Sequence, residues 1–251
     1  AMGAAAASCV EGLLPAQRVP KSITLKYFPI AGRAEPIRLA LVLGKLPFTD
    51  QRIPGDEWEE KHKPQMPWGQ LPVLVLDGRR TLCQTKAVLR YTGKIAKYNG
   101  AYLYPKDAVL AAKVDELLDA FDDLWILLSP TYTIKDAAAK AAARQQLFAP
   151  GGLAAALVQI FERTLGEQGD AGFCVREVGM SIADLMYFCF FNVIRSGFID
   201  GLSKDMFKEY PNIMRHKEKI ASLPEVRAYY KDKQRSNPAG VPNYEVFEPG
   251  Q

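Results

Sequence analysis

Residues 70–85 read QLPVLVLDGRRTLCQT, and this stretch decides the fold. A proline opens a short apolar run, Pro72 to Leu76, which predicts a buried strand. Asp77-Gly78 predicts a tight turn, and Arg80 to Cys83 predicts the strand that returns from it. Thr85 stands where a helix should begin, because its side chain suits the N-cap position. The stretch therefore predicts a β-hairpin that leads directly into a helix.

A strand, a helix and a second strand are expected before this hairpin. Residues Ile23 to Phe28 alternate apolar and polar side chains, which predicts a strand with one buried face. A helix is expected from Arg33 to Gly44, since Pro36 is tolerated only in a first helical turn. Residues 50–53 predict another short strand, and residues 85–98 predict the closing helix.

The order of these elements predicts an α/β domain. With a polar segment over residues 55–67 that is bounded by prolines, the order is βαβαββα. One parallel crossover and two antiparallel neighbours give a mixed sheet, and the crossover should be right-handed. This is the thioredoxin-like pattern.

After residue 98 the pattern changes to helical spacing. Residues 99–106 are rich in Gly, Tyr and Pro and predict a linker, and the apolar spacing beyond them predicts an all-α domain. The expected helices cover 114–130, 136–148, 153–165, 182–195 (opened by a capping box, Ser181 to Asp184), 203–210, 211–222 and 224–233, and Tyr244 and Phe247 are candidate docking points in the tail. The predicted organisation is a disordered extension over 1–20, an α/β domain over 21–98 and a helical domain with its tail over 107–251.

Composition excludes several classes of protein. A net charge of +4 over 251 residues, without a dense basic stretch, argues against nucleic-acid binding. No apolar run reaches the ~20 residues that span a bilayer. The 4 cysteines form no Cys-x-x-Cys pair and favour a reducing compartment, and the 2 histidines have no ligand spacing. We expect a cytoplasmic protein that binds neither nucleic acid, membrane nor metal.

Several motifs in the first domain belong together. They are Tyr27-Phe28, the run Gly32 to Arg38, Trp58, Gln70-Leu71-Pro72 and Gln84-Thr85. With these residues, the segment 26–98 resembles the N-terminal domain of cytosolic glutathione transferases of the tyrosine type. It is most similar to the sigma class, with some features of the alpha class, and the resemblance extends over about residues 22–235. It implies that the protein binds glutathione as a co-substrate and transfers its sulfur to a hydrophobic electrophile.

The resemblance implies a catalytic role for Tyr27 and Arg33. A free thiol with a pKa near ~8.5 is only slightly ionised at neutral pH, and the thiolate is the nucleophile. A hydroxyl that donates a hydrogen bond to the sulfur favours the charged form. Tyr27 matches the family's catalytic tyrosine, and Arg33 matches the arginine that reinforces the thiolate. Taken alone, Tyr27 would be read as a core tyrosine and Arg33 as a surface arginine.

The resemblance also implies how the rest of glutathione is held. Pro72 matches a cis-proline, so that the backbone of Leu71 would pair with the cysteinyl part; a trans proline on an edge strand is the alternative. Near Gln70, Gln84 and Thr85, the helix N-terminus would bind the γ-glutamyl carboxylate. Trp58 would hold the glycyl end together with a lysine, and this sequence departs from the family there. His62 occupies the lysine position, between Lys61 and Lys63, either of which could reach the carboxylate.

A homodimer follows from the same resemblance. Asp123 matches an acidic residue that reaches the ammonium group of glutathione in the partner subunit, although a solvated acidic helix face would also explain it. Trp68 matches an aromatic lock in some classes and could equally be a domain-packing residue.

The electrophile pocket is expected between the domains. Its expected lining is apolar and polarisable: Tyr27, Phe28, Ile30, Trp125, Pro130, Met186 and Phe190.

Three other functions use the same fold. They are a glutathione-dependent isomerase such as a prostaglandin synthase, a thiol oxidoreductase, and a ligand-binding or structural protein. The oxidoreductase is disfavoured because the loop after Tyr27 contains no cysteine.

Overall fold

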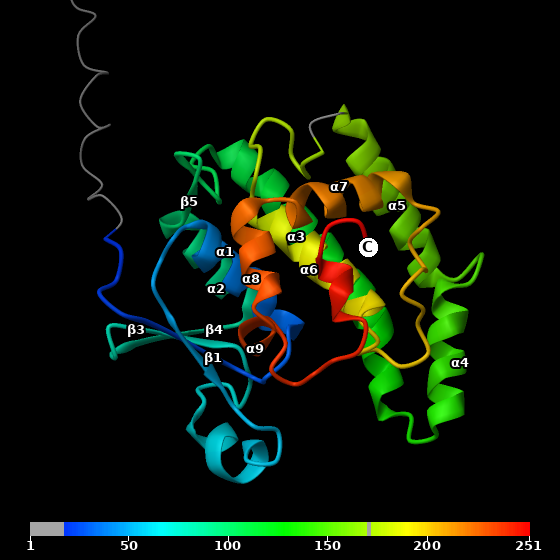
Figure 1. Cartoon of the computed structure of the whole chain (residues 1–251), viewed down its shortest axis with the longest axis horizontal. Coiled ribbons are helices and arrows are strands. Elements are labelled where there is room, and N and C mark those ends of the chain that lie inside the picture. Colours follow the sequence, from blue (N-terminus) through cyan, green and yellow to red (C-terminus); the bar gives the residue numbers. More distant parts are fainter. Residues whose placement is uncertain (1–17, 170–171) are drawn as a thin grey trace, which may run out of the picture.

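A mixed sheet of four strands forms the first half of the molecule. The computed structural model describes residues 18–169 and 172–251, so almost all of the extension expected over 1–20 lies outside it. The strands are β1 (Ile23–Tyr27), β2 (Thr49–Arg52), β3 (Val73–Leu76) and β4 (Arg80–Cys83), in the order β2-β1-β3-β4. β1 is parallel to β2 and antiparallel to β3, which confirms the predicted mixed sheet (Figure 1).

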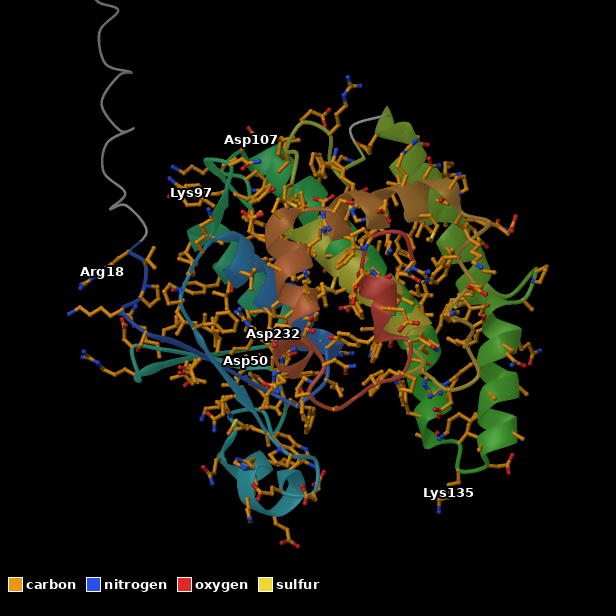
Figure 2. The ribbon with its side chains drawn as sticks, in the orientation of Figure 1. Arg18, Asp50, Lys97, Asp107, Lys135 and Asp232 are labelled. Atoms are coloured by element: carbon orange, nitrogen blue, oxygen red, sulfur yellow. The ribbon has the colours of Figure 1, made fainter. Side chains whose placement is uncertain are left out.

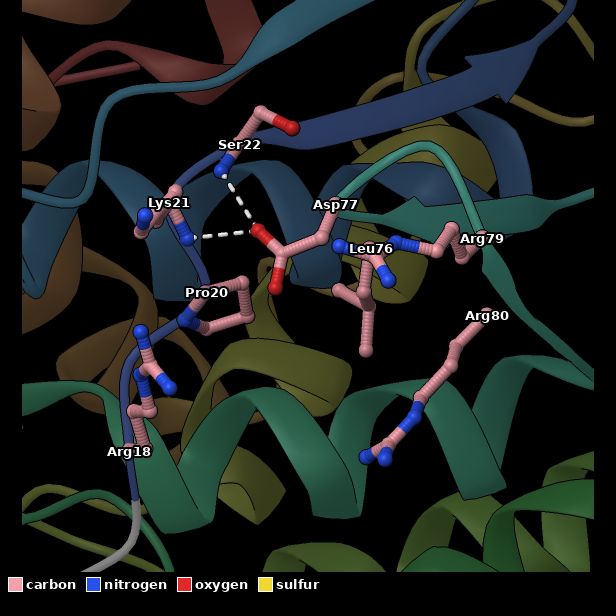
Figure 3. Close-up of a pocket in the computed structure, with 8 residues that line it drawn as sticks. All are labelled: Arg18, Pro20, Lys21, Ser22, Leu76, Asp77, Arg79 and Arg80. Carbon is pink, nitrogen blue, oxygen red and sulfur yellow. Dashed lines mark hydrogen bonds between the residues drawn. The ribbon is translucent and has the colours of Figure 1, made fainter.

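The antiparallel pairing brings the start of β1 to the end of β3. Ile23 lies opposite Leu76, so the residues just before β1 meet the turn between β3 and β4. In that turn the carboxylate of Asp77 accepts hydrogen bonds from the backbone N–H groups of Lys21, at 2.7 Å, and Ser22, at 3.1 Å (Figure 3). This contact fixes where the chain enters the sheet.

Two helices cover the sheet, and two sequence-based expectations need correction there. The helices are α1 (Glu35–Leu43) and α2 (Thr85–Ile95). The second helix of the predicted order βαβαββα is not an α-helix: the polar, proline-bounded segment between β2 and β3 forms only a π turn, Trp58–His62, and a 3-10 turn, Lys63–Gln65. The closing helix ends at Ile95 rather than at residue 98.

A short hairpin takes the place of that last helical turn. β5 (Lys97–Tyr98) pairs with β6 (Ala101–Tyr102), and Asn99-Gly100 forms the turn with φ values of 49° and 86°. An Asn-Gly pair favours this backbone, so the hairpin could have been read from the sequence.

Helices make up the rest of the molecule. They are α3 (Ala108–Leu128), α4 (Ala137–Phe148), α5 (Leu153–Glu167), α6 (Ile182–Arg195), α7 (Pro211–Ala221), α8 (Pro224–Lys231) and α9 (Lys233–Ser236). α6 is buried along its whole length. The expected capping box at its start is present, with Ser181 and Asp184 bonded reciprocally. The helix expected over 203–210 is wrong, because that segment forms only turns.

The tail packs back onto the molecule, as expected from its aromatic residues. A 3-10 turn, Tyr244–Phe247, places Phe247 in the core, with its ring stacked on Tyr230 at 4.8 Å between centroids.

The side chains of Arg18 and Lys135 lie at opposite ends of the molecule in Figure 2. Within the described chain, no helix combines the length and apolar character that a bilayer span requires. The predicted domain boundaries stay a prediction.

Candidate active site

The hydroxyl of Tyr27 occupies the end of β1, where the chain turns toward α1. The side chain is 6% exposed, and its oxygen accepts a hydrogen bond of 3.0 Å from the backbone N–H of Arg33. Because that bond uses a lone pair of the oxygen, the hydroxyl hydrogen stays free to donate to another group.

The environment keeps this phenol protonated. Burial raises the pKa of Tyr27, and this effect outweighs the backbone hydrogen bond from Arg33 and the positive charges of Arg38 and Arg33, which lower it. The group is therefore a hydrogen-bond donor at neutral pH and not a base.

Gly32 allows the hydroxyl to sit where it does. Its φ is +46°, and a Cβ built on it would lie 2.6 Å from the oxygen of Tyr27. Any side chain at this position would be strained and would also displace the phenol. No pattern in the sequence predicts this role for the glycine.

Replacing Gly32 by alanine is expected to lower turnover roughly 10- to 100-fold, because a shifted hydroxyl no longer meets its target. Gly78→Ala is the matched control, since φ is +63° there and a Cβ would meet nothing within 4 Å. Both variants should lose about 1 kcal/mol in urea unfolding, but only Gly32→Ala should lose activity in steady-state kinetics. Equal activity of the two variants would contradict this account.

A cavity of about 400 Å³ adjoins the hydroxyl. Residues from β1, α1, α2, α3 and α6, and from the segments that follow β1, α3 and α6, line it: Tyr27, Phe28, Ile30, Gly32, Arg33, Pro36, Thr85, Lys86, Phe121, Asp122, Trp125, Tyr132, Met186, Cys189, Phe190, Val193 and Phe198. Its lining is mostly apolar and aromatic, which suits a hydrophobic ligand beside a few polar groups.

Six of the seven residues expected in the electrophile pocket line this cavity, and Pro130 does not. Pro130 is exposed and lines a different hollow, beside Leu127 and Ile134. After α3 ends at Leu128, the chain makes a 3-10 turn, Ser129–Thr133, and this turn brings Tyr132 to the cavity instead. The position of Pro130 is therefore corrected, since sequence spacing along a helix did not predict the turn.

Aromatic contacts fix the polar groups at the cavity wall. The guanidinium of Arg33 lies 4.8 Å from the ring centroid of Trp125, and that of Arg144 lies 4.8 Å from the ring of Tyr132. Burial raises the pKa of Tyr132, so this second phenol in the cavity is also protonated. Such stacked cation–π pairs hold the arginine planes in place.

The start of α2 carries an unusual backbone. Gln84, not Thr85, is the N-cap, with φ 71° and ψ 117° and no capping hydrogen bond from its side chain. Its amide donates instead to Oε1 of Gln70, at 3.0 Å. The expectation that Thr85 caps the helix is therefore corrected: it is the first helical residue. The Leu71-Pro72 peptide bond is cis, as the resemblance implied.

Trp58 packs against Phe28, a residue of the cavity wall. The rings of Trp58 and Phe28 meet edge to face at 5.4 Å between centroids. Lys61 and Lys63 pair with Glu57 and Glu59 one turn away, at 3.1 and 2.8 Å. All four charged groups are substantially exposed, so either lysine can exchange its partner for a ligand at little cost.

A ladder of charges that the sequence analysis missed joins α2 to α3. Nζ of Lys86 lies 2.5 Å from Asp119 and 2.6 Å from Asp122, and Arg90 pairs with Asp115 at 2.6 Å. The spacing of the three aspartates, one turn apart along α3, was a signal that could have revealed it. Asp123 is exposed, and within the described chain its carboxylate forms no hydrogen bond or ion pair.

Behind the cavity, a buried ion cluster holds the loop between β1 and α1. Arg38 is fully buried and lies 2.9 Å from Glu35 and 3.0 Å from Asp50. The same guanidinium donates hydrogen bonds to the carbonyls of Ile30 and Ala31. Burial opposes its charge, but the two carboxylates prevail and raise the pKa of Arg38. The loop that carries the Tyr27 site is thus bonded from behind.

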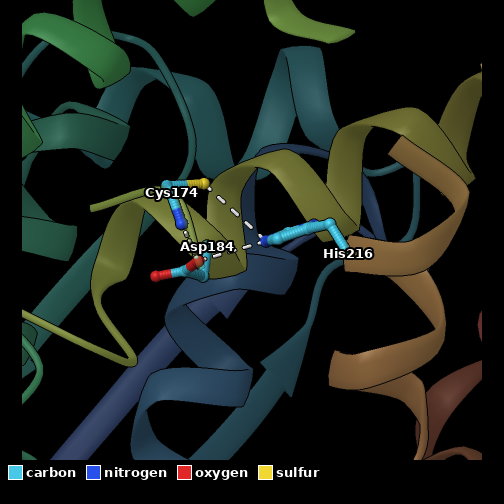
Figure 4. A group of neighbouring side chains, drawn as sticks. All are labelled: Cys174, Asp184 and His216. Carbon is cyan, nitrogen blue, oxygen red and sulfur yellow. Dashed lines mark hydrogen bonds and ion pairs between the residues drawn. The ribbon is translucent and has the colours of Figure 1, made fainter. Parts of the chain in front are cut away.

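A second buried cluster consists of Cys174, Asp184 and His216, none of which lines the cavity (Figure 4). Nε2 of His216 faces both the thiol, at 3.7 Å, and Oδ1 of Asp184, at 3.1 Å. A catalytic relay would use the two ring nitrogens separately, so this is not one. Asp184 also accepts hydrogen bonds from Cys174 N–H and from Ser181, and burial raises the pKa of the thiol well above its usual value. The contacts describe a helix cap with a histidine donor.

Sequence comparisons identify relatives along most of the chain. A family model described as Glutathione S-transferase, C-terminal domain, matches residues 122–233. Probable glutathione S-transferase 8 of Caenorhabditis elegans is 30% identical over 211 residues, which cover 82% of this chain and 93% of that protein. S-crystallin SL11 of Nototodarus sloanii is 28% identical over 219 residues, covering 87% and 98%.

Solved structures give the same picture. The prostaglandin synthase D of Nilaparvata lugens superposes with a TM-score of 0.72 at 26% identity, covering 84% of this chain and 98% of that one. The Pi-class glutathione S-transferase of Onchocerca volvulus gives a TM-score of 0.69 at 25% identity, covering 88% and 97%. With a buried tyrosine at the wall of an apolar cavity and relatives matched over nearly their full length, this chain belongs to the glutathione S-transferase family.

Proposed function

We propose that this protein is a glutathione S-transferase that joins the glutathione thiolate to hydrophobic electrophiles, with Tyr27 activating the thiol. The observation that carries the proposal is the position of the Tyr27 hydroxyl. This hydroxyl accepts a 3.0 Å hydrogen bond from Arg33 N–H and faces a largely apolar cavity of about 400 Å³. A phenol that stays protonated can donate to a sulfur and so favours the thiolate.

Roles follow for the other groups near the cavity. The uncapped N-terminus of α2, at Thr85, offers N–H groups to the γ-glutamyl carboxylate. Gln70 and Gln84 lie beside it, the backbone of Leu71 can pair with the cysteinyl part, and Trp58 borders the glycyl end. Lys61 and Lys63 are the candidate cations for the glycyl carboxylate, and Arg33 reinforces the thiolate.

The electrophile would occupy the aromatic part of the cavity. Phe28, Trp125 and Phe190 present ring faces and edges there, with Met186 and Ile30 as adaptable apolar contacts. A flat, polarisable electrophile fits this lining better than a charged one.

The proposal is tested by measuring conjugation of glutathione to chlorodinitrobenzene by the purified protein. Enzymatic product formation that saturates with both substrates supports it. Binding of glutathione in calorimetry without product from a panel of electrophiles would favour a non-enzymatic role such as that suggested by the name of the S-crystallin relative.

A glutathione-dependent isomerase is the second candidate, and the likeness to a prostaglandin synthase favours it. An isomerase regenerates glutathione in each cycle, whereas a transferase consumes one thiol for each product. Counting free thiols during turnover of an endoperoxide therefore separates the two functions.

A homodimer belongs to the proposal. Trp68 is 69% exposed and Ile126, on α3 near Asp123, is 63% exposed, so both offer apolar surface to a second copy. Asp123 would then reach the ammonium of glutathione in the partner subunit.

The proposed setting is the cytoplasm, which the free thiols of Cys83, Cys174 and Cys189 support.

Replacing Asp123 by asparagine is expected to raise the KM for glutathione roughly tenfold, because a charge-assisted hydrogen bond to the ammonium is lost. Glu116→Gln is the matched control, an exposed carboxylate on the same helix whose partner is Lys113. Steady-state kinetics at varied glutathione measures both variants.

Subunit mixing tests whether Asp123 acts across the dimer. A heterodimer of Tyr27→Phe and Asp123→Asn subunits would contain one site with both native residues, so its activity should exceed that of either parent. Activity no higher than the average of the two parents would show that Asp123 does not act on the partner's site.

A further inference from the structure

A hollow of about 540 Å³ opens at the end of β1 opposite to Tyr27. It is lined by Arg18, Pro20, Lys21, Ser22, Leu76, Asp77, Arg79 and Arg80, and none of these residues lines the cavity of Tyr27. We call it the basic hollow. The proposed transferase chemistry uses no part of it.

The charges around the basic hollow are strongly unbalanced. Arg18, Lys21, Arg79 and Arg80 contribute four cations, and Asp77 contributes one carboxylate. That carboxylate is already bonded to the backbone N–H groups of Lys21 and Ser22. Within the part of the chain that the structure describes, none of the four cations forms an ion pair. Lys86 and Arg38, by contrast, each contact two carboxylates.

The topology of the sheet brings these cations together. Arg79 and Arg80 follow the turn at Asp77-Gly78, while Arg18 and Lys21 lead into β1, the antiparallel neighbour of β3. In Figure 3 the guanidinium groups of Arg18 and Arg80 lie on either side of Pro20 and Leu76. The bonds to Asp77 hold the two segments together, so all four cations border the same hollow.

We propose that the basic hollow binds a ligand that carries two or more phosphate groups. Planar guanidinium groups recognise phosphate oxygens through paired hydrogen bonds, and three of the four cations are arginines. The volume suits a small molecule or a headgroup. The eight lining residues include no aromatic ring, so recognition rests on the phosphates and not on a base.

The test is calorimetry with inorganic tripolyphosphate, comparing wild type with Arg79→Gln/Arg80→Gln. The matched control is Arg176→Gln/Arg227→Gln, which removes the same charge from exposed positions in the helical part. We expect saturable binding that weakens between about 50 and 200 mM salt. Binding should weaken at least about tenfold in the Arg79/Arg80 variant and remain near wild type in the control. Unchanged glutathione conjugation by the Arg79/Arg80 variant verifies its fold.

Vesicles of phosphatidylcholine containing a phosphatidylinositol bisphosphate distinguish the two sources of such phosphates. Sedimentation with vesicles that needs Arg79 and Arg80 assigns the hollow to a lipid headgroup, and tripolyphosphate binding alone assigns it to a free ligand. The proposal is overturned if neither probe binds wild type at low salt. It is equally overturned if both double variants bind with the same affinity.

Discussion

Replacing Tyr27 by phenylalanine is expected to lower turnover by roughly 10- to 1000-fold, a loss of about 1.4–4 kcal/mol at the transition state. The ring and its packing against Phe28 remain, so the cavity keeps its shape. Only the hydroxyl is removed, and with it the donor that stabilises a thiolate. Affinity for glutathione, measured by calorimetry, should change little.

The pH profile of the Tyr27→Phe variant separates this mechanism from simple misfolding. At saturating glutathione, the apparent pKa in kcat/KM for the electrophile reports the thiol in the enzyme–glutathione complex, and it should rise toward the ~8.5 of a free thiol when the donor is lost. Activity of the variant should therefore recover partly as the pH increases. Tyr91→Phe is the control, a half-buried tyrosine of α2 that does not line the cavity. An unshifted profile in Tyr27→Phe would remove the hydroxyl from the mechanism.

Local signals predicted most of the sheet because each needs only neighbouring residues. Asp77-Gly78 between two short runs gave β3 and β4 almost residue by residue, and the capping box at Ser181 gave the start of α6. The helix predicted over residues 203–210 is wrong because that prediction, too, used only neighbouring residues. Their composition allowed a helix, but the segment forms turns, and from these turns Phe207 contacts the rings of Phe148 and Phe191.

The candidate site was predictable only where a motif marks it. Tyr27, Thr85 and Met186 line the cavity. They could be predicted as site residues because the sequence predicts their strand and helices. Tyr132 and Gly32 could not be found this way. A 3-10 turn and a positive φ place them there, and neither leaves a periodic pattern. Their roles depend on atoms contributed by other segments.

The buried ion cluster behind the loop is a further case that local patterns hide. In the sequence, Glu35 and Arg38 are three residues apart and look like an exposed helical pair. In the structure both are 0% exposed, and the carboxylate of Glu35 also accepts a 2.9 Å hydrogen bond from Tyr230 of α8. Arg52 adds bonds to the carbonyls of Ile30 and Arg235. The cluster thus ties the loop beside Tyr27 to the C-terminal helices.

Replacing Arg38 by leucine is therefore expected to lower the free energy of unfolding by about 3–5 kcal/mol, because the Glu35 carboxylate is left buried without its charge partner. Turnover should fall as well, since the carbonyls of Ile30 and Ala31 lose a donor and the loop loosens. Urea unfolding and steady-state kinetics measure the two effects. Lys113→Leu, which breaks an exposed pair with Glu116, should cost less than about 1 kcal/mol.

A double variant, Glu35→Leu/Arg38→Leu, distinguishes the cost of an unpaired charge from the cost of a loosened loop. Removing Glu35 as well eliminates the uncompensated carboxylate, so the double variant should be more stable than Arg38→Leu alone. Its turnover should nevertheless stay low, because the carbonyls of Ile30 and Ala31 still lack the guanidinium. If the double variant regained full activity, the cluster would serve stability alone. If it were less stable than Arg38→Leu, the lost packing and not the stranded charge would dominate.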